Sequence, residues 1–182
     1  TKLYPCAHVI HPFLEGALDL RRREGVAAPD VVAVRCRVAP WQVPIVCEPR
    51  ETKLAPQTEY QARASLPFAL AAALADGRVD LDTFTPAAID RPELRALAAR
   101  VTFEPAPASE PGFAATLEVQ TRDGRRLVAE ATAAPPDPAR VRAKFATTAG
   151  RLLDTERVAA LVAAVERPEP ITPAELLAFC RA

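Results

Sequence analysis

The sequence contains few of the residues and motifs that identify the common classes of binding site. Only 5% of its 182 residues are aromatic, it has no methionine, and histidine occurs twice. Basic and acidic residues number 23 each, so the charge indicates neither nucleic acid nor an anionic membrane surface as a partner. A glycine-rich phosphate loop, a Gly-x-Ser-x-Gly motif and interleaved aromatic and basic residues are all missing. We therefore expect no nucleic-acid partner.

Long apolar segments and paired cysteines are missing too. No hydrophobic run approaches the length that crosses a membrane, and no secretory signal is visible. The cysteines form neither a C-x-x-C pair nor an obvious disulfide framework; they are Cys6, Cys36, Cys47 and Cys180. The sequence therefore predicts a reduced, cytoplasmic protein with no membrane partner.

What is present is enough apolar material for a core. The chain is 49% hydrophobic and 25% charged, which predicts one globular domain over residues 1–182 with a core of alanine, valine and leucine.

Apolar spacing and capping residues predict helices at both ends of the chain and strands in the middle. We expect helices over residues 12–24, 66–75, 92–99, 138–148, 155–165 and 172–180. We expect strands over residues 31–39, 100–104, 114–122 and 125–132. Residues 40–64 contain four prolines and are predicted to form a long connection around a short strand near 43–47. The pattern predicts an α+β fold, a mainly antiparallel sheet with helices packed on one face as a two-layer sandwich.

Both histidines and a lysine lie in the first eleven residues, so Lys2, His8 and His11 are the candidate functional cluster. One interpretation is a solvated lysine beside two incidental histidines. A second is a metal site, because His8, His11 and Glu15 would share one face of a helix. Pro12 disfavours helical geometry at His11 and cannot donate an N–H, so we predict no metal ligands here.

A third interpretation is an acid/base site that handles anions. If a helix begins at His11 or Pro12, His11 lies at the positive end of the helix dipole, where free N–H groups favour a carboxylate or phosphate. The same field disfavours a protonated imidazole, so His11 is able to act as a base near neutral pH. Lys2 would add positive charge for a substrate carboxylate or an enolate-like intermediate. From the residues alone, the three interpretations stay open.

Basic and hydroxyl residues also border the long connection. Lys53 and Arg63 flank it, and Ser65 is the expected N-cap of the next helix. We place these three in a candidate pocket for a substrate carboxylate, with ordinary structural roles as the alternative.

The opening segment resembles a known family. Lys2-Leu3-Tyr4-Pro5-Cys6, then His11 and the helix with Glu15-Gly16-Ala17-Leu18, is similar to the opening of the C-terminal domain of the MmgE/PrpD family. The family has a helix that begins with Phe-Ser-Leu-Pro-Tyr. This chain has Ala64 at the first position of that motif, where an aromatic residue is more usual. The resemblance continues in the expected order through residues 62–74, the hairpin at 121–124 and Lys144-Phe145.

The resemblance implies a parent chain well over twice this length. Its all-helical N-terminal domain would carry the rest of the active site, and residues 1–182 would form an α+β lid. The chain also lacks an initiator methionine, from which we likewise expect that it is a piece cut from a longer protein. The resemblance further implies a homodimeric parent with no metal and no organic cofactor. Lys2 and His11 match motif positions that line the cleft. His8 lies one residue beyond a place where some members carry a functional histidine, so the three are the expected catalytic residues.

The family's shared chemistry would be removal of a proton next to a carboxylate. Dehydratases then expel a β-hydroxyl, the decarboxylase loses carbon dioxide, and the epimerase returns the proton on the other face. We expect a lyase that dehydrates a small di- or tricarboxylate similar to 2-methylcitrate, and an isolated chain that is inactive. The alternatives are an epimerase or decarboxylase of the same family, or a non-catalytic module that binds carboxylates or joins subunits.

Overall fold

The computed structural model describes residues 2–107, 113–132 and 137–179. These residues fall into two compact units, one within residues 2–134 and one within residues 135–182.

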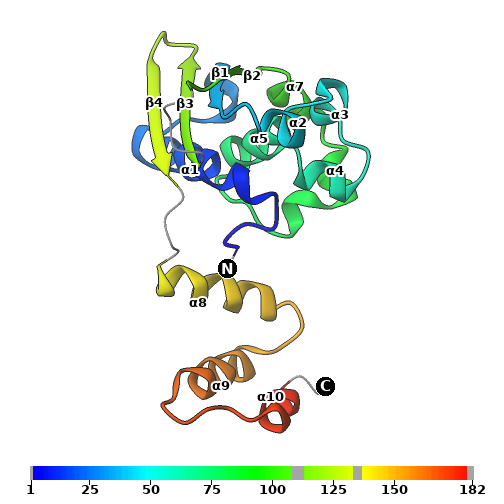
Figure 1. Ribbon diagram of the computed structural model, residues 1–182, viewed down its shortest axis with the longest axis vertical. Coiled ribbons are helices and arrows are strands. Elements are labelled where there is room, and N and C mark those ends of the chain that lie inside the picture. The colour runs from blue at the N-terminus through cyan, green and yellow to red at the C-terminus, as the bar shows by residue number, and fades with distance from the viewer. Residues whose placement is uncertain (1, 108–112, 133–136, 180–182) are drawn as a thin grey trace. The chain divides into compact units, whose positions relative to one another are not determined.

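A four-stranded sheet is the framework of the larger unit, in the order β2–β1–β3–β4 (Figure 1). The strands are β1 (Val31–Val38), β2 (Val101–Pro105), β3 (Ala114–Thr121) and β4 (Arg126–Thr132). β1 is antiparallel to β3, and β3 is antiparallel to β4, but β1 and β2 are parallel. The sheet is therefore mixed, because residues 39–100 form the long crossover that a parallel pair requires. The predicted α+β class is confirmed.

One face of this sheet is buried and the other is solvated. On the solvated face, Arg37 donates to Thr116 Oγ1 at 2.7 Å, and Arg35 lies 3.9 Å from Glu118. The buried face carries apolar side chains with at most 1% exposure, namely Val34, Cys36, Val38, Leu117 and Val119. This alternation is the signal that predicted the strands.

The start of β1 departs from the predicted alternation. Strict alternation with Val34, Cys36 and Val38 would place Val32 on the buried face, but Val32 is 47% exposed and Val31 is fully buried. The pairing of β1 with β3 shifts its register between Val31 and Ala33, and such a bulge reverses which side chains face the core.

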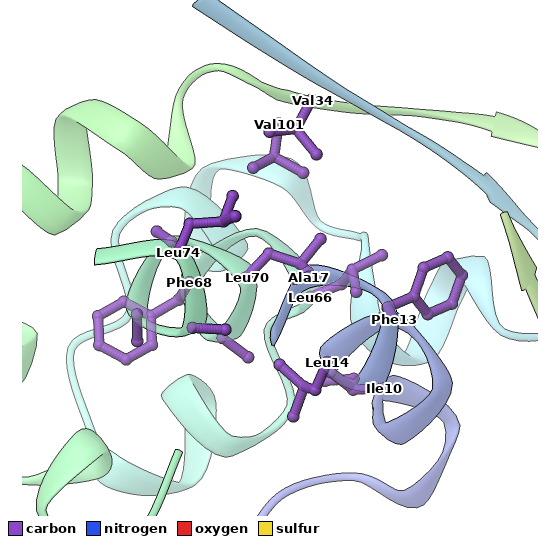
Figure 2. Close-up of a cluster of buried hydrophobic side chains, with 14 of the residues drawn as sticks. Ile10, Phe13, Leu14, Ala17, Val34, Leu66, Phe68, Leu70, Leu74 and Val101 are labelled. Carbon is purple, nitrogen blue, oxygen red and sulfur yellow. The ribbon is translucent and has the colours of Figure 1, made fainter. Parts of the chain in front are cut away.

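Two helices cover the buried face, α1 (His11–Glu24) and α5 (Leu66–Asp76). α1 packs on β3 and β4, and α5 packs on α1, on β2 and on α7 (Pro92–Ala98). Figure 2 shows the core between them, with side chains from both helices meeting two from the sheet. Those it labels are Ile10, Phe13, Leu14, Ala17, Val34, Leu66, Phe68, Leu70, Leu74 and Val101. These contacts make the start of α1 a fixed part of the fold.

The helix α5 begins at the predicted residue and ends one residue later than predicted. Ser65 Oγ accepts the backbone N–H of Phe68 at 3.1 Å, which caps the first turn. Gly77 follows the last turn with φ of 69°, a left-handed conformation that glycine adopts without strain.

The long connection is helical, and the short strand predicted near 43–47 is wrong. That stretch forms α2 (Val43–Val46), followed by α3 (Arg50–Leu54) and α4 (Glu59–Arg63). Pro44 lies in the first turn of α2, where its missing N–H has no helical partner to lose. In a strand the same proline would remove a ladder hydrogen bond. The remaining short elements are η1 (His8–Ile10), η2 (Ala28–Asp30), η3 (Asp82–Phe84) and α6 (Pro86–Ile89).

The second unit contains α8 (Pro138–Ala149), α9 (Thr155–Glu166) and α10 (Pro173–Phe179). Asp137 and Asp154 cap the first two helices through backbone N–H groups. The three late helices were all predicted from the sequence, although Cys180, the expected end of the last, lies outside the described residues. Across the described parts of both units, no helix combines the length and hydrophobicity needed to cross a membrane.

Candidate functional site

The structure brings Lys2, His8 and His11 together at the start of α1. The segment before α1 turns through η1, and Ile10 N–H donates to Ala7 O at 3.0 Å. Lys2 Nζ donates to Cys6 O at 3.3 Å, which folds the lysine back over this turn. The two imidazole rings lie 4.9 Å apart between centroids. Lys2 and His8 are exposed and His11 is buried, so the three residues are neighbours in different environments.

His11 is the buried member of the cluster, with 8% of its surface exposed. The Tyr4 ring meets the imidazole edge-on, with centroids 5.2 Å apart and planes at 83°. Tyr4 is held in turn by its hydroxyl, which donates to Glu15 Oε1 at 2.9 Å. Because Glu15 lies one turn after His11 on α1, the helix fixes both the imidazole and the ring that packs against it.

The surroundings of His11 keep its imidazole neutral. Burial, then the positive charges of His8 and Lys2, lower the pKa of His11 from its ordinary value of 6.5 to about 4, although the backbone of Cys6 and Tyr4 opposes this. His11 Nε2 is buried and has no hydrogen-bond partner among the described residues. When the neutral imidazole carries its proton on Nδ1, the lone pair of Nε2 is free.

The neighbouring Cys6 is not activated as a nucleophile. Burial raises the pKa of its thiol to about 12, although the charge of Lys2 opposes the shift. A thiol held protonated at neutral pH attacks slowly, so Cys6 serves the turn through packing.

Two of the residues predicted to bind substrate lie in the interior instead. Lys53 is 8% exposed, and its ammonium donates to Ile45 O and Ala64 O, each at 2.7 Å. Burial lowers the pKa of Lys53. Ser65 is fully buried, and its hydroxyl donates to Lys53 O at 2.5 Å. Together they fix the corner between α4 and α5.

Arg63 lies at that corner and is joined to the site through its backbone. Its carbonyl accepts the N–H of Ala7 at 2.8 Å, which ties α4 to the turn before η1. Its side chain pairs with Glu59 at 3.1 Å. Arg63 Nε is buried and has no hydrogen-bond partner in the described part of the chain. Lys53 and Ser65 therefore hold the corner between α4 and α5, and the backbone of Arg63 links that corner to the opening segment.

Two aromatic residues that the sequence analysis missed extend the cluster. Phe113 lies 5.9 Å from His8 between ring centroids, and Trp41 lies 5.8 Å from Phe113. Trp41 and Phe113 are 48% and 43% exposed, so these rings border the site from the solvent side. Nothing local marks either residue, because they are far apart in the sequence and meet only through the sheet.

The cluster does not provide a metal site. No group of three histidine, cysteine, aspartate or glutamate side chains within the described ranges is arranged to hold a metal ion. The ammonium group of Lys2 beside the two imidazoles suits an anion.

Two comparisons with known proteins bear on this geometry. Residues 4–167 match the family model of the MmgE/PrpD C-terminal domain. The chain is also similar to cis-aconitate decarboxylase of Mus musculus, with 25% identity over 131 residues. The aligned part is 67% of this chain and 27% of that relative, so the chain spans only about a quarter of the relative's length.

Proposed function

The chain belongs to the MmgE/PrpD family, as its opening motif predicted, and from that premise we propose that it is the C-terminal lid domain of a lyase that acts on a small di- or tricarboxylate. In this proposal an all-helical N-terminal domain of the same longer chain completes the site. The full protein is a cytoplasmic homodimer that uses neither a metal nor an organic cofactor.

The observation that carries the proposal is the unpaired Nε2 of His11. Nε2 of this imidazole is buried and has no hydrogen-bond partner among the described residues, so its lone pair can accept a proton from a substrate that reaches it. A substrate that brings several carboxylates raises the pKa of this imidazole on binding, because nearby negative charge favours the imidazolium. Binding of substrate would therefore turn a weak base into an effective one.

The reaction follows from this placement. His11 Nε2 takes the proton from the carbon next to a carboxylate, and the electron pair of the broken C–H bond forms an enolate-like intermediate. The Lys2 ammonium stabilises its negative charge. The electron pair of the enolate-like intermediate then forms the carbon–carbon double bond as the β-hydroxyl leaves. The leaving hydroxyl takes up a proton and departs as water. His8, which is exposed and lies beside His11, is the candidate for donating that proton.

Decarboxylation is the second candidate, and the similarity to cis-aconitate decarboxylase is what favours it. In that reaction a carboxylate leaves as carbon dioxide, the electron pair passes through an enolate-like intermediate, and a histidine returns a proton to carbon. The same cation and imidazole serve both reactions, so only the substrate separates them.

The test uses the full-length protein that contains this chain. The ultraviolet absorbance of unsaturated acids is followed with 2-methylcitrate, citrate, hydroxy diacids and cis-aconitate as substrates. We expect one of them to be turned over, and we expect Lys2→Ala and His11→Gln to lower kcat/KM by about 10²–10⁴-fold. Lys144→Ala, a lysine change in the other unit, is the matched control and retains wild-type activity.

Each result has a distinct meaning. Turnover that survives both site variants keeps the lyase and removes the catalytic assignment. Epimerisation without a change in absorbance supports the epimerase. Carboxylate binding without any reaction supports the non-catalytic module, and retained circular dichroism shows that the variants are folded.

A further inference from the structure

A short series of aromatic rings adjoins the candidate site, in a chain that has few aromatic residues. The only tryptophan and one phenylalanine adjoin both histidines in a continuous series of ring contacts, Trp41–Phe113–His8–His11. We call Trp41 and Phe113 the aromatic shelf. Both side chains are close to half exposed, which is unusual for rings of this size in a chain with an apolar core.

The sheet explains why the shelf forms. Trp41 follows the end of β1 and Phe113 precedes the start of β3, and these strands are antiparallel with Arg37 opposite Thr116. The end of one strand therefore lies beside the start of the other. Because the packing of α1 on β3 fixes η1 against the same framework, the shelf is held at the histidines by regular structure.

The resulting surface is divided chemically. Lys2 suits a carboxylate, and His11, whose Nε2 is buried and has no hydrogen-bond partner among the described residues, is the proposed base for the carbon next to it. Trp41 and Phe113 offer apolar surface that is partly exposed to solvent, and the ring of Phe113 also contacts the imidazole of His8. A ligand that uses both parts has carboxylates at one end and an apolar group next to them.

We infer that Trp41 and Phe113 are specificity-determining residues that select carboxylates bearing an apolar substituent. The inference rests on the proposed carboxylate site and adds a preference within it. Unsubstituted acids of the same length reach Lys2 and His11 but leave the shelf exposed to water, so they bind more weakly.

The experiment measures binding rather than turnover. Succinate, methylsuccinate and phenylsuccinate carry two carboxylates and no β-hydroxyl, so dehydration does not consume them. Titration calorimetry with the full-length protein gives their dissociation constants. We expect methylsuccinate to bind about 4-fold more tightly than succinate, the effect of burying one methyl group, and phenylsuccinate more tightly still.

Three variants localise the preference. Trp41→Ala and Phe113→Ala should reduce the ratio of succinate to methylsuccinate dissociation constants to within about 2-fold of unity, whereas Trp41→Phe retains part of it. Tyr60→Ala changes an aromatic side chain that is 83% exposed on α4 and is the matched control, with an unchanged ratio.

Equal affinities for the three acids, or no binding of any of them, would overturn the inference. So would a preference for methylsuccinate that survives both alanine variants, or a preference that Tyr60→Ala reduces as much as they do. Loss of association between domains or subunits without a change in the ratio would make the shelf a protein contact and also overturn it. Turnover, assayed separately, keeps the two proposals distinct. Catalysis without the preference removes only the shelf, and the preference without catalysis removes only the lyase.

Discussion

His11 shows how the charge of one side chain follows from its neighbours. Its imidazole is nearly buried, so the protonated form loses hydration, and the charged groups nearest to it, His8 and Lys2, are cations. Both effects act against a second positive charge, which lowers the pKa of His11 to about 4. Between that value and 6.5 the unfolded chain binds the proton and the folded chain does not. The stabilisation due to neutral His11 is therefore complete above pH 6.5 and is lost as the pH falls toward 4.

The first prediction concerns this pH dependence. The C2–H proton resonance of His11 should titrate with a midpoint near pH 4. Acidification from pH 6.5 to 4 should remove about 1–3 kcal/mol of stability that the His11→Gln variant does not lose, measured by urea unfolding. His8→Gln, a change of the exposed histidine, is the control and keeps most of the loss. A His11 midpoint near 6.5, or equal pH slopes for wild type and His11→Gln, would contradict this account.

At the scale of elements, the close packing of α1 on β4 depends on a single glycine. A Cβ atom at Gly16 would lie 3.1 Å from Ala129 Cβ, so any larger side chain pushes the helix away from the strand. Because α1 carries His11 at its first position, this contact also helps to set where the imidazole lies.

We predict that Gly16→Val destabilises the fold by about 1–3 kcal/mol through overpacking. Thermal or urea unfolding measures the loss, and Arg22→Val is the control. It places the same side chain on the solvated side of α1, where the side chain of Arg22 is 78% exposed, and should cost less than about 1 kcal/mol. A loss in Gly16→Val no larger than that in Arg22→Val would show that the contact with β4 does not limit the side chain at this position.

At the scale of the whole molecule, the candidate site receives its chemistry from one short segment. Lys2, His8 and His11 all come from the turn that leads into α1, and the chain spans 27% of the relative that it resembles. A reaction through an enolate-like intermediate needs a site that surrounds the substrate and excludes water. On our proposal, the other half of that site is in the N-terminal domain.

We therefore predict that the 182-residue chain alone folds but does not catalyse the reaction. Circular dichroism should report helices and strands, while turnover should fall below 1/100 of that of the full-length protein, a loss of about 10²-fold or more. Adding the separately expressed N-terminal segment should restore part of the activity. Turnover by the isolated chain at the full-length rate would show that the described cluster is sufficient and would remove the need for a second domain.

The elements of this fold were largely predictable, because their signals are local. Ser65 caps the start of α5 with a hydrogen bond, and Gly77 ends the helix because it adopts a left-handed conformation. Both effects act within a few residues. The failures have local causes too. Pro44 lies in the first turn of a helix whose short apolar sequence does not distinguish it from a strand. A bulge turns Val32 to solvent.

The sequence by itself determined the candidate cluster, since Lys2, His8 and His11 are close in the chain and one turn followed by a helix suffices to bring them together. Only the tertiary structure decided the environments of the other residues. Basic side chains near the site look alike in the sequence, but packing buries the ammonium of Lys53 against carbonyl groups. Trp41 and Phe113 meet because strand pairing joins distant segments. Burial and long-range pairing depend on how the whole chain packs, and no short stretch of sequence encodes them.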